Sequence, residues 1–140
     1  MILCFSQDDF KIVEEAYKKN KYPKDIFGIP YCYLKDHSLS GLLSKNENLF
    51  ITAHGNNQEI GNKNEGLSFN ASQLATFIKS IIPGGFTGSI YVSACDTAPV
   101  YSTNLKNALH GSNINVPVYG CRGAINLDIA APGNAMWVRA

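Results

Sequence analysis

The chain has 140 residues, of which 45% are hydrophobic and 16% charged, and its formal net charge is +1. This composition is typical of a globular protein and excludes a disordered chain. So small a net charge does not support a generally basic nucleic-acid-binding surface, and no apolar run approaches the length of a membrane span. The length predicts a single domain over residues 1–140.

The first part of the chain alternates strand and helix signals. Residues 2–5 are apolar and predict a buried strand, and residues 8–20 carry apolar side chains at helical spacing. A second strand is predicted over residues 26–34, where Pro30 favours an edge position because proline lacks the N–H that a central strand needs. Residues 36–48 are mostly polar, with leucines that predict a short turn of helix.

The remaining elements follow the same alternation. An apolar run over residues 49–53 and another over 89–95 predict buried strands, and helical spacing over 68–82 predicts the helix between them. Residues 55–66 are too polar for a core segment and predict a surface loop or a small hairpin.

Beyond the second of these strands, residues 101–110 predict a helix with Gly111 as its C-cap, and residues 116–120 predict a strand. A loop over 121–134 and a last short strand at 136–138 complete the chain. The expected fold is an α/β three-layer sandwich with a mostly parallel sheet flanked by helices.

Two of the buried strands end in chemically reactive side chains, His54 and Cys95. A strand, helix, strand connection joins parallel neighbours, so both residues are expected at the carboxyl edge of the sheet, where open α/β sheets place their ligand sites. A thiol near an imidazole can act as a nucleophile in acyl transfer, and the imidazole can then protonate the leaving group. Gly55 has no Cβ, so its backbone can approach a substrate closely.

The four cysteines, Cys4, Cys32, Cys95 and Cys121, show no CxxC pair and no regular spacing. This pattern argues against a zinc site and against a disulfide framework, so no metal or cofactor is expected. A reducing, cytoplasmic environment fits free thiols best.

These motifs resemble the caspase-like cysteine peptidase superfamily. The residues that carry the resemblance are His54-Gly55, Ile60-Gly61, Leu67-Ser68, the run Val92-Ser93-Ala94-Cys95-Asp96-Thr97-Ala98, and the run Val116-Pro117-Val118-Tyr119-Gly120-Cys121-Arg122-Gly123. The run around Cys95 is similar to the Ser-Ala-Cys-x-Thr run of bacterial caspase-like domains. The chain also resembles the self-cleaving cysteine protease domains of large bacterial toxins. The resemblance covers residues 49–123.

By position, the resemblance makes Cys95 the nucleophile and His54 its general acid/base, with the N–H groups of Gly55 and Cys95 as oxyanion donors. Ser93 corresponds to a position that lines the pocket for the side chain before the cleaved bond. Because Ser93 is small and uncharged, an uncharged substrate residue is expected there, unless the Asp96 side chain turns inward. Arg122 is a candidate for binding a substrate carboxylate, since it follows the strand expected beside Cys95.

The chain also departs from the superfamily pattern. Caspases have Gln before Ala-Cys and Gly two positions after the Cys, whereas this chain has Ser93 and Thr97. Aspartate specificity is therefore not expected. The chain has no basic cluster of the kind with which the toxin domains bind an inositol phosphate, so that dependence is not carried over.

The sequence leaves two main hypotheses. The first is a cysteine endopeptidase that acts through a thioester acyl-enzyme on a protein or peptide substrate. The second is a catalytically inactive caspase-like module that binds a protein or peptide in the same groove. A different Cys-dependent acyl transferase or hydrolase on a flavodoxin-like sheet is disfavoured because residues 5–8 contain no phosphate-binding glycine. Neither nucleic acid nor membrane is expected as a partner, and no oligomeric state is predicted.

Overall fold

The computed structural model describes residues 1–33, 38–62 and 66–140. In this part of the chain the main sheet has six strands in the order β2-β1-β3-β7-β8-β9. Their bounds are β1 Ile2–Cys4, β2 Pro30–Cys32, β3 Leu49–Thr52, β7 Ile90–Ser93, β8 Val118–Cys121 and β9 Trp137–Arg139. Neighbours run parallel from β2 to β8, and β9 is antiparallel to β8. The fold is α/β with a mostly parallel sheet, as predicted.

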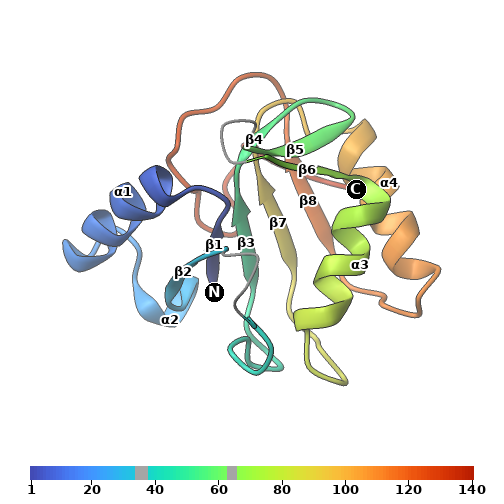
Figure 1. Ribbon diagram of the computed structural model, residues 1–140, viewed down its shortest axis with the longest axis horizontal. Coiled ribbons are helices and arrows are strands. Elements are labelled where there is room, and N and C mark those ends of the chain that lie inside the picture. Colours follow the sequence, from blue (N-terminus) through green and yellow to red (C-terminus); the bar gives the residue numbers. More distant parts are fainter. Residues whose placement is uncertain (34–37, 63–65) are drawn as a thin grey trace.

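Helices cover both faces of this sheet. Figure 1 shows α1 (Gln7–Lys18) and α2 (Lys24–Phe27) on one side and α3 (Ala71–Ile81) and α4 (Val100–His110) on the other. This arrangement agrees with the predicted three layers. The helix α1 begins where the N–H of Asp9 donates to the Ser6 hydroxyl over 3.2 Å, which satisfies one of the donors that a helix start leaves free.

Side chains of successive strand residues pack into two separate cores. Leu3, Ile51 and Val92 join the core that contains the buried faces of α3 and α4, whereas Phe50 and Tyr91 join the core on the α1 side. This alternation follows from the two-residue period of a strand. Because both faces are buried, the strands are continuous apolar runs, and the burial of each large side chain contributes roughly 1.5–3 kcal/mol.

Aromatic rings form a row across the α1 side of the sheet. The ring centroids are 4.9 Å apart for Phe27 and Phe50, 4.8 Å for Phe50 and Tyr91, and 4.7 Å for Tyr91 and Tyr119. Trp137 packs against Tyr91 with its ring centroid at 4.9 Å. Aromatic contacts at these distances are favourable beyond the area they bury. The row therefore ties α2, β3, β7, β8 and β9 together.

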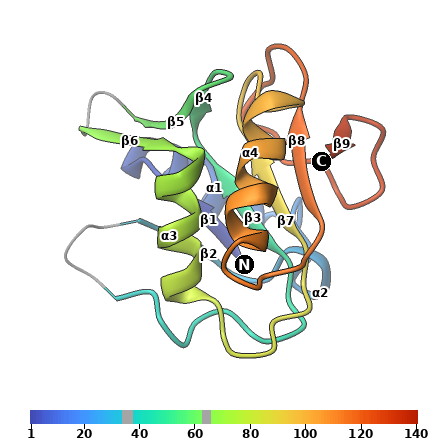
Figure 2. The same ribbon diagram turned by 90° about the vertical axis from the view of Figure 1, so that its right-hand side faces the viewer.

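A second, antiparallel sheet follows β3. Its strands are β4 (His54–Gly55), β5 (Glu59–Asn62) and β6 (Leu67–Asn70), in that order across the sheet. Figures 1 and 2 place this small sheet at the upper end of β3 and α3. The hairpin alternative predicted for residues 55–66 is thus confirmed for its described part.

Two predicted elements have different bounds or types in the structure. Residues 26–27 lie in α2 rather than in a strand, because the carbonyl of Pro23 accepts hydrogen bonds from Ile26 and Phe27 and a helical turn buries the Phe27 ring. The strand is therefore limited to Pro30–Cys32, and it lies at the edge of the sheet as Pro30 predicts. The predicted helical turn over 36–48 is wrong for its described residues, 38–48, and its remaining residues lie outside the described part.

The helix predicted over residues 68–82 begins later, at Ala71. A capping box fixes this start: the side chain of Asn70 accepts from the N–H of Gln73 over 2.8 Å, and the Gln73 side chain accepts from the N–H of Asn70 over 2.9 Å. Ser68 and its neighbours therefore remain free to pair with β5 as a strand.

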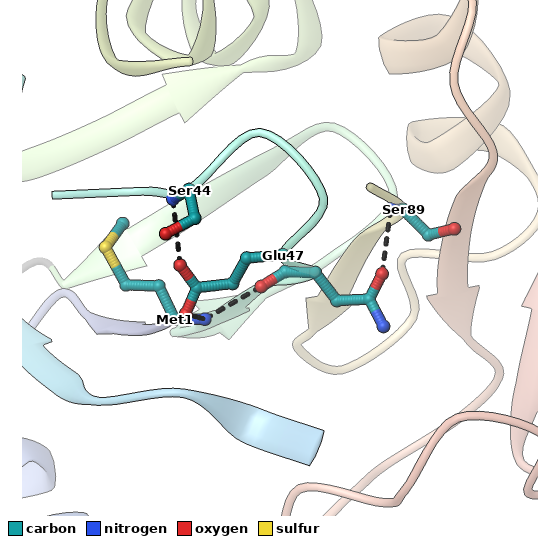
Figure 3. Close-up of polar contacts among 5 residues, drawn as sticks. Met1, Ser44, Glu47 and Ser89 are labelled. Carbon is teal, nitrogen blue, oxygen red and sulfur yellow. Dashed lines mark hydrogen bonds and ion pairs between the residues drawn. The ribbon is translucent and has the colours of Figure 1, made fainter. Parts of the chain in front are cut away.

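A short segment, residues 44–48, connects the amino ends of three central strands through hydrogen bonds. Figure 3 shows the Glu47 carboxylate between the Met1 amino group, 2.8 Å away, and the N–H of Ser44, 2.9 Å away. The next residue, Asn48, accepts from Met1 through its carbonyl and from the N–H of Ser89 through its side chain. These contacts hold the starts of β1, β3 and β7 at the same level, which fixes where the strands end at the opposite edge.

We predict that Gly28→Ala destabilises the fold through this cluster. Gly28 has φ +70° and ψ −152°, a combination found essentially in glycine alone, and a Cβ there would lie 2.0 Å from Oε2 of Glu47. Gly41 is a matched control, since it has φ +83° but open space around it. Urea unfolding should show a loss of about 1 kcal/mol for Gly41→Ala from backbone strain and a larger loss for Gly28→Ala. A Cβ at Gly28 would also lie 2.6 Å from the backbone nitrogen of Met1, so equal losses would show that neither Met1 nor Glu47 resists the added methyl group.

Candidate active site

His54 and Cys95 follow neighbouring strands at the same edge of the sheet. Thr52 of β3 pairs with Ser93 of β7, and each candidate catalytic residue lies two positions further along its chain. Since β3 and β7 are parallel, both residues leave the sheet at its carboxyl edge. The prediction that these two strands are parallel neighbours is confirmed.

The backbone beside His54 packs directly against that of Cys95. A Cβ built on Gly55 would lie 2.9 Å from the Cβ of Ala94 and 3.1 Å from the carbonyl oxygen of Cys95. Only a residue without a side chain allows this approach. The structure therefore brings the His54-Gly55 and Ala94-Cys95 segments together, and glycine is required at position 55 for close packing.

The thiol of Cys95 is half-buried and contacts the segment after β8. The N–H of Ile125 donates to Sγ over 3.3 Å, and Sγ lies 3.6 Å from the carbonyl oxygen of the same residue, to which the thiol donates. If Cys95 were a thiolate, its sulfur could still accept the hydrogen bond from the Ile125 N–H. The backbone of Ile125 thus lies against the candidate nucleophile.

Residues 122–136, which contain Ile125, are anchored on the α1 side of the sheet. The N–H of Ile129 donates to the Tyr22 hydroxyl over 3.3 Å, and the Trp137 indole N–H donates to the carbonyl of Ala130 over 3.1 Å. Lys21 and Asp128 form an exposed ion pair. The loop predicted over 121–134 therefore packs on the core of the α1 side and also reaches the carboxyl edge of the sheet.

Asp96 adopts a left-handed backbone conformation, with φ 55°, directly after the candidate nucleophile. Its N–H donates to the carbonyl of Gly123 over 3.0 Å, and its side chain is exposed. A non-glycine residue in this conformation is uncommon and marks a position that its surroundings determine. Because its N–H is already bonded, Asp96 is not an oxyanion donor in this structure.

Thr97 holds the turn that carries Cys95, and the sequence analysis missed this role. Its fully buried hydroxyl lies 2.9 Å from the carbonyl oxygen of Ala94 and 3.3 Å from that of Val92, and it accepts from the N–H of Cys121 over 3.0 Å. A single hydroxyl therefore joins the end of β7 to the end of β8. A buried Thr among apolar residues was the available signal, but its partners are far apart in the sequence.

The other predicted site residues lie around the same edge. Ser93 is the last residue of β7 and only 2% exposed, and Arg122 is exposed directly after β8, the strand beside β7. The substrate-binding roles of Ser93, Asp96 and Arg122 stay predictions. The helix predicted over residues 101–110 is confirmed as α4, which begins at Val100, five residues after Cys95.

A cavity of about 310 Å³ opens beside His54, and the sequence analysis did not identify it. Its lining comes from all three strands of the small sheet and the turn between the first two: His54, Gly55, Asn56, Glu59, Ile60, Gly61, Asn62, Leu67 and Ser68. The alternating pattern of β5 was the available signal, but the segment is short and polar. The cavity places a carboxylate, that of Glu59, in the neighbourhood of the candidate general acid/base.

The four cysteines are free thiols in different environments. Burial raises the pKa of the Cys4 thiol far above its ordinary value, and burial likewise raises the pKa of Cys121 to about 11. Cys32 and Cys95 are only half-buried. Because the thiolate is the reactive form, Cys4 and Cys121 are protected from alkylating reagents by both burial and protonation.

Comparison of the chain with protein-family models, with curated proteins and with solved structures found no match. Among the residues that the structure describes, no group of three or more His, Cys, Asp or Glu side chains is placed to hold a metal ion. No helix in the described ranges has the length and apolar character needed to cross a membrane. The functional argument therefore depends on the geometry at the carboxyl edge.

We predict that Thr97→Val lowers the free energy of unfolding by about 3 kcal/mol, because it leaves buried backbone groups of β7 and β8 without their partner. Thr97→Ser keeps the hydroxyl and should lose less. Chemical denaturation of both variants measures the difference. A valine variant as stable as the wild type would contradict the role assigned to this hydroxyl.

We also predict that Cys121 makes the fold sensitive to alkali. Its pKa is about 11 in the folded protein against 9.0 for the ordinary thiol, so between these values the unfolded chain loses its proton first. Stability therefore falls as the pH rises from about 9 to 11. Urea unfolding of Cys121→Ala across this range should show a smaller fall than the wild type, and an equal fall would contradict the prediction.

Proposed function

We propose that the protein is a cysteine endopeptidase with Cys95 as nucleophile and His54 as general acid/base. The observation that carries the proposal is the contact of the Gly55 backbone with the carbonyl of Cys95, at the edge where β3 and β7 both end. It brings the backbone of the His54-Gly55 segment against that of Cys95, as a Cys-His pair requires. The resemblance of residues 49–123 to the caspase-like superfamily supports the same assignment.

The reaction would proceed in two stages. The His54 imidazole takes the proton of the Cys95 thiol, and the sulfur attacks the carbonyl carbon of a peptide bond. The C–N bond breaks as the imidazolium gives that proton to the leaving amine, which leaves a thioester on Cys95. In the second stage His54 takes a proton from the water that attacks the thioester, the C–S bond breaks to release the carboxylic acid product, and the imidazolium returns the proton to the sulfur.

Two backbone N–H groups are proposed to stabilise the oxyanion, those of Gly55 and Cys95. Both belong to the segments that pack against each other. The N–H of Asp96 is excluded because it is bonded to Gly123. Donors fixed in position before the reaction contribute to catalysis because no reorganisation is needed when the charge develops.

The substrate is proposed to be a protein or peptide. Ser93 would favour an uncharged residue before the cleaved bond, with Asp96 and Arg122 as further contacts at the exposed rim. The exposed guanidinium of Arg122 is suited to a substrate carboxylate. No cofactor enters this chemistry, and a free thiol nucleophile suits a reducing compartment such as the cytoplasm.

One observation favours a second candidate, a caspase-like module that binds a peptide without cutting it. The backbone of Ile125 occupies both the acceptor and the donor capacity of the Cys95 sulfur. In such a module, a partner would bind at the rim of the groove while the Cys95 thiol stays hydrogen-bonded to Ile125. Under this alternative, Cys95→Ala leaves the biological activity intact.

We predict that iodoacetamide labels Cys95 at least about tenfold faster than Cys4 and Cys121 at neutral pH, because burial keeps those two thiols protonated. His54→Ala should slow the labelling of Cys95 by removing the base, but it should leave Cys32 unchanged. Peptide mapping by mass spectrometry after timed labelling gives each rate.

Incubation of the wild type, Cys95→Ala and His54→Ala with a mixed peptide library separates the two proposed functions. If the protein is a peptidase, the wild type cuts the library and both variants lose this activity. Slow, uniform labelling of all four thiols together with no Cys95-dependent cleavage would reject the peptidase and leave the binding module.

A further inference from the structure

A row of three residues crosses the small sheet beside a cavity. His54 pairs with Gly61, and Gly61 pairs with Ser68, so these residues lie in register across β4, β5 and β6. Glycine is needed in the middle because the backbone of β6 lies close to it: a Cβ on Gly61 would be 2.2 Å from the carbonyl oxygen of Leu67. The cavity of about 310 Å³ is lined by all three residues, and its volume is at the lower end of the ~300–1,000 Å³ typical of ligand pockets. It therefore suits a single side chain.

Glu59 is placed on the same face as this row. It lies two residues before Gly61, and residues two apart in a strand share a face. Of the lining residues that the structure describes, Glu59 is the one that carries a carboxylate. The cavity thus presents one negative charge, which suits a cationic side chain.

Hydrogen bonds fix the position of this carboxylate. Oε2 of Glu59 accepts from the Ser68 hydroxyl over 2.7 Å, so the group leans toward β6, the strand farther from His54. The backbone of Glu59 is held by Asn56, whose side chain accepts from the N–H of Glu59 over 2.9 Å and whose own N–H donates to the Glu59 carbonyl over 3.0 Å. A cationic side chain could therefore enter between His54 and the carboxylate.

The proposed chemistry indicates which part of a substrate reaches the cavity. His54 must protonate the amine that leaves when the peptide bond breaks, and this amine belongs to the residue after the cleaved bond. Because His54 itself lines the cavity, the side chain of that residue lies nearest to it. Ser93, by contrast, lies at the end of β7 on the Cys95 side.

We propose that this cavity binds the Lys or Arg side chain of the substrate residue that follows the cleaved bond, with Glu59 as its charge partner. The inference rests on the proposed peptidase function and adds a specificity on the leaving side of the bond. The ammonium or guanidinium donates to the carboxylate of Glu59 in a charge-assisted hydrogen bond.

Binding can be tested without any cleavage. N-acetyl-lysine amide is titrated into the ¹⁵N-labelled full chain carrying Cys95→Ala, and N-acetyl-norleucine amide, which has a similar stem without the charge, is the matched probe. Backbone amide signals of Glu59, Gly61 and Ser68 should shift with the lysine probe at concentrations about tenfold lower than with norleucine. Glu59→Gln should remove this difference, and Ser68→Ala should retain most of it.

Equal responses to the two probes, or a lysine preference that persists in Glu59→Gln, would overturn the assignment. A cleavage assay gives the second measurement: peptides with Lys or Arg after the cleaved bond should have a higher kcat/KM than peptides with norleucine or Glu, and Glu59→Gln should lose the difference mainly through KM. Cys95-dependent cleavage without such a preference overturns the specificity alone. Cleavage that survives Cys95→Ala instead rejects the peptidase function.

Discussion

The parallel pairing of β3 with β7 is the constraint on which the rest of the site depends. Thr52 and Ser93 are paired, so a shift of one residue in either strand would exchange its two buried faces and move His54 relative to Cys95. The register is held from both ends. Glu47 and Asn48 fix the amino ends of the strands, and the hydroxyl of Thr97 fixes the carboxyl end of β7 to β8. Two buried polar clusters thus position an edge that is otherwise held by apolar packing.

Much of the fold could be predicted from the sequence, because buried parallel strands are continuous apolar runs. The positions of β1, β3, β7 and β8 follow from this property. The small sheet was harder to predict, since its strands are short and polar and are paired by long-range contacts. The helix α3 starts later than predicted because Asn70 is its N-cap and exchanges hydrogen bonds with Gln73. Local hydrogen bonds of this kind move the bounds of elements that composition alone locates.

The candidate site was predictable only where chemistry and strand ends coincide. His54 and Cys95 stand out because reactive side chains follow apolar runs. Thr97 and Glu59 do not, since their importance comes from partners at β8 and β6. Gly61 has the weakest signal of all, because the close backbone of Leu67 that requires a glycine there belongs to another strand.

In the proposed peptidase, the contact between Ile125 and the Cys95 sulfur would make the chain itself a competitor of the substrate. The segment that carries Ile125 is held on the α1 side of the sheet by hydrogen bonds of Ile129 with Tyr22 and of Ala130 with Trp137. Substrate entry would then be an exchange rather than the filling of vacant space. Hydrogen bonds far from the thiol would help to set how readily the thiol is reached.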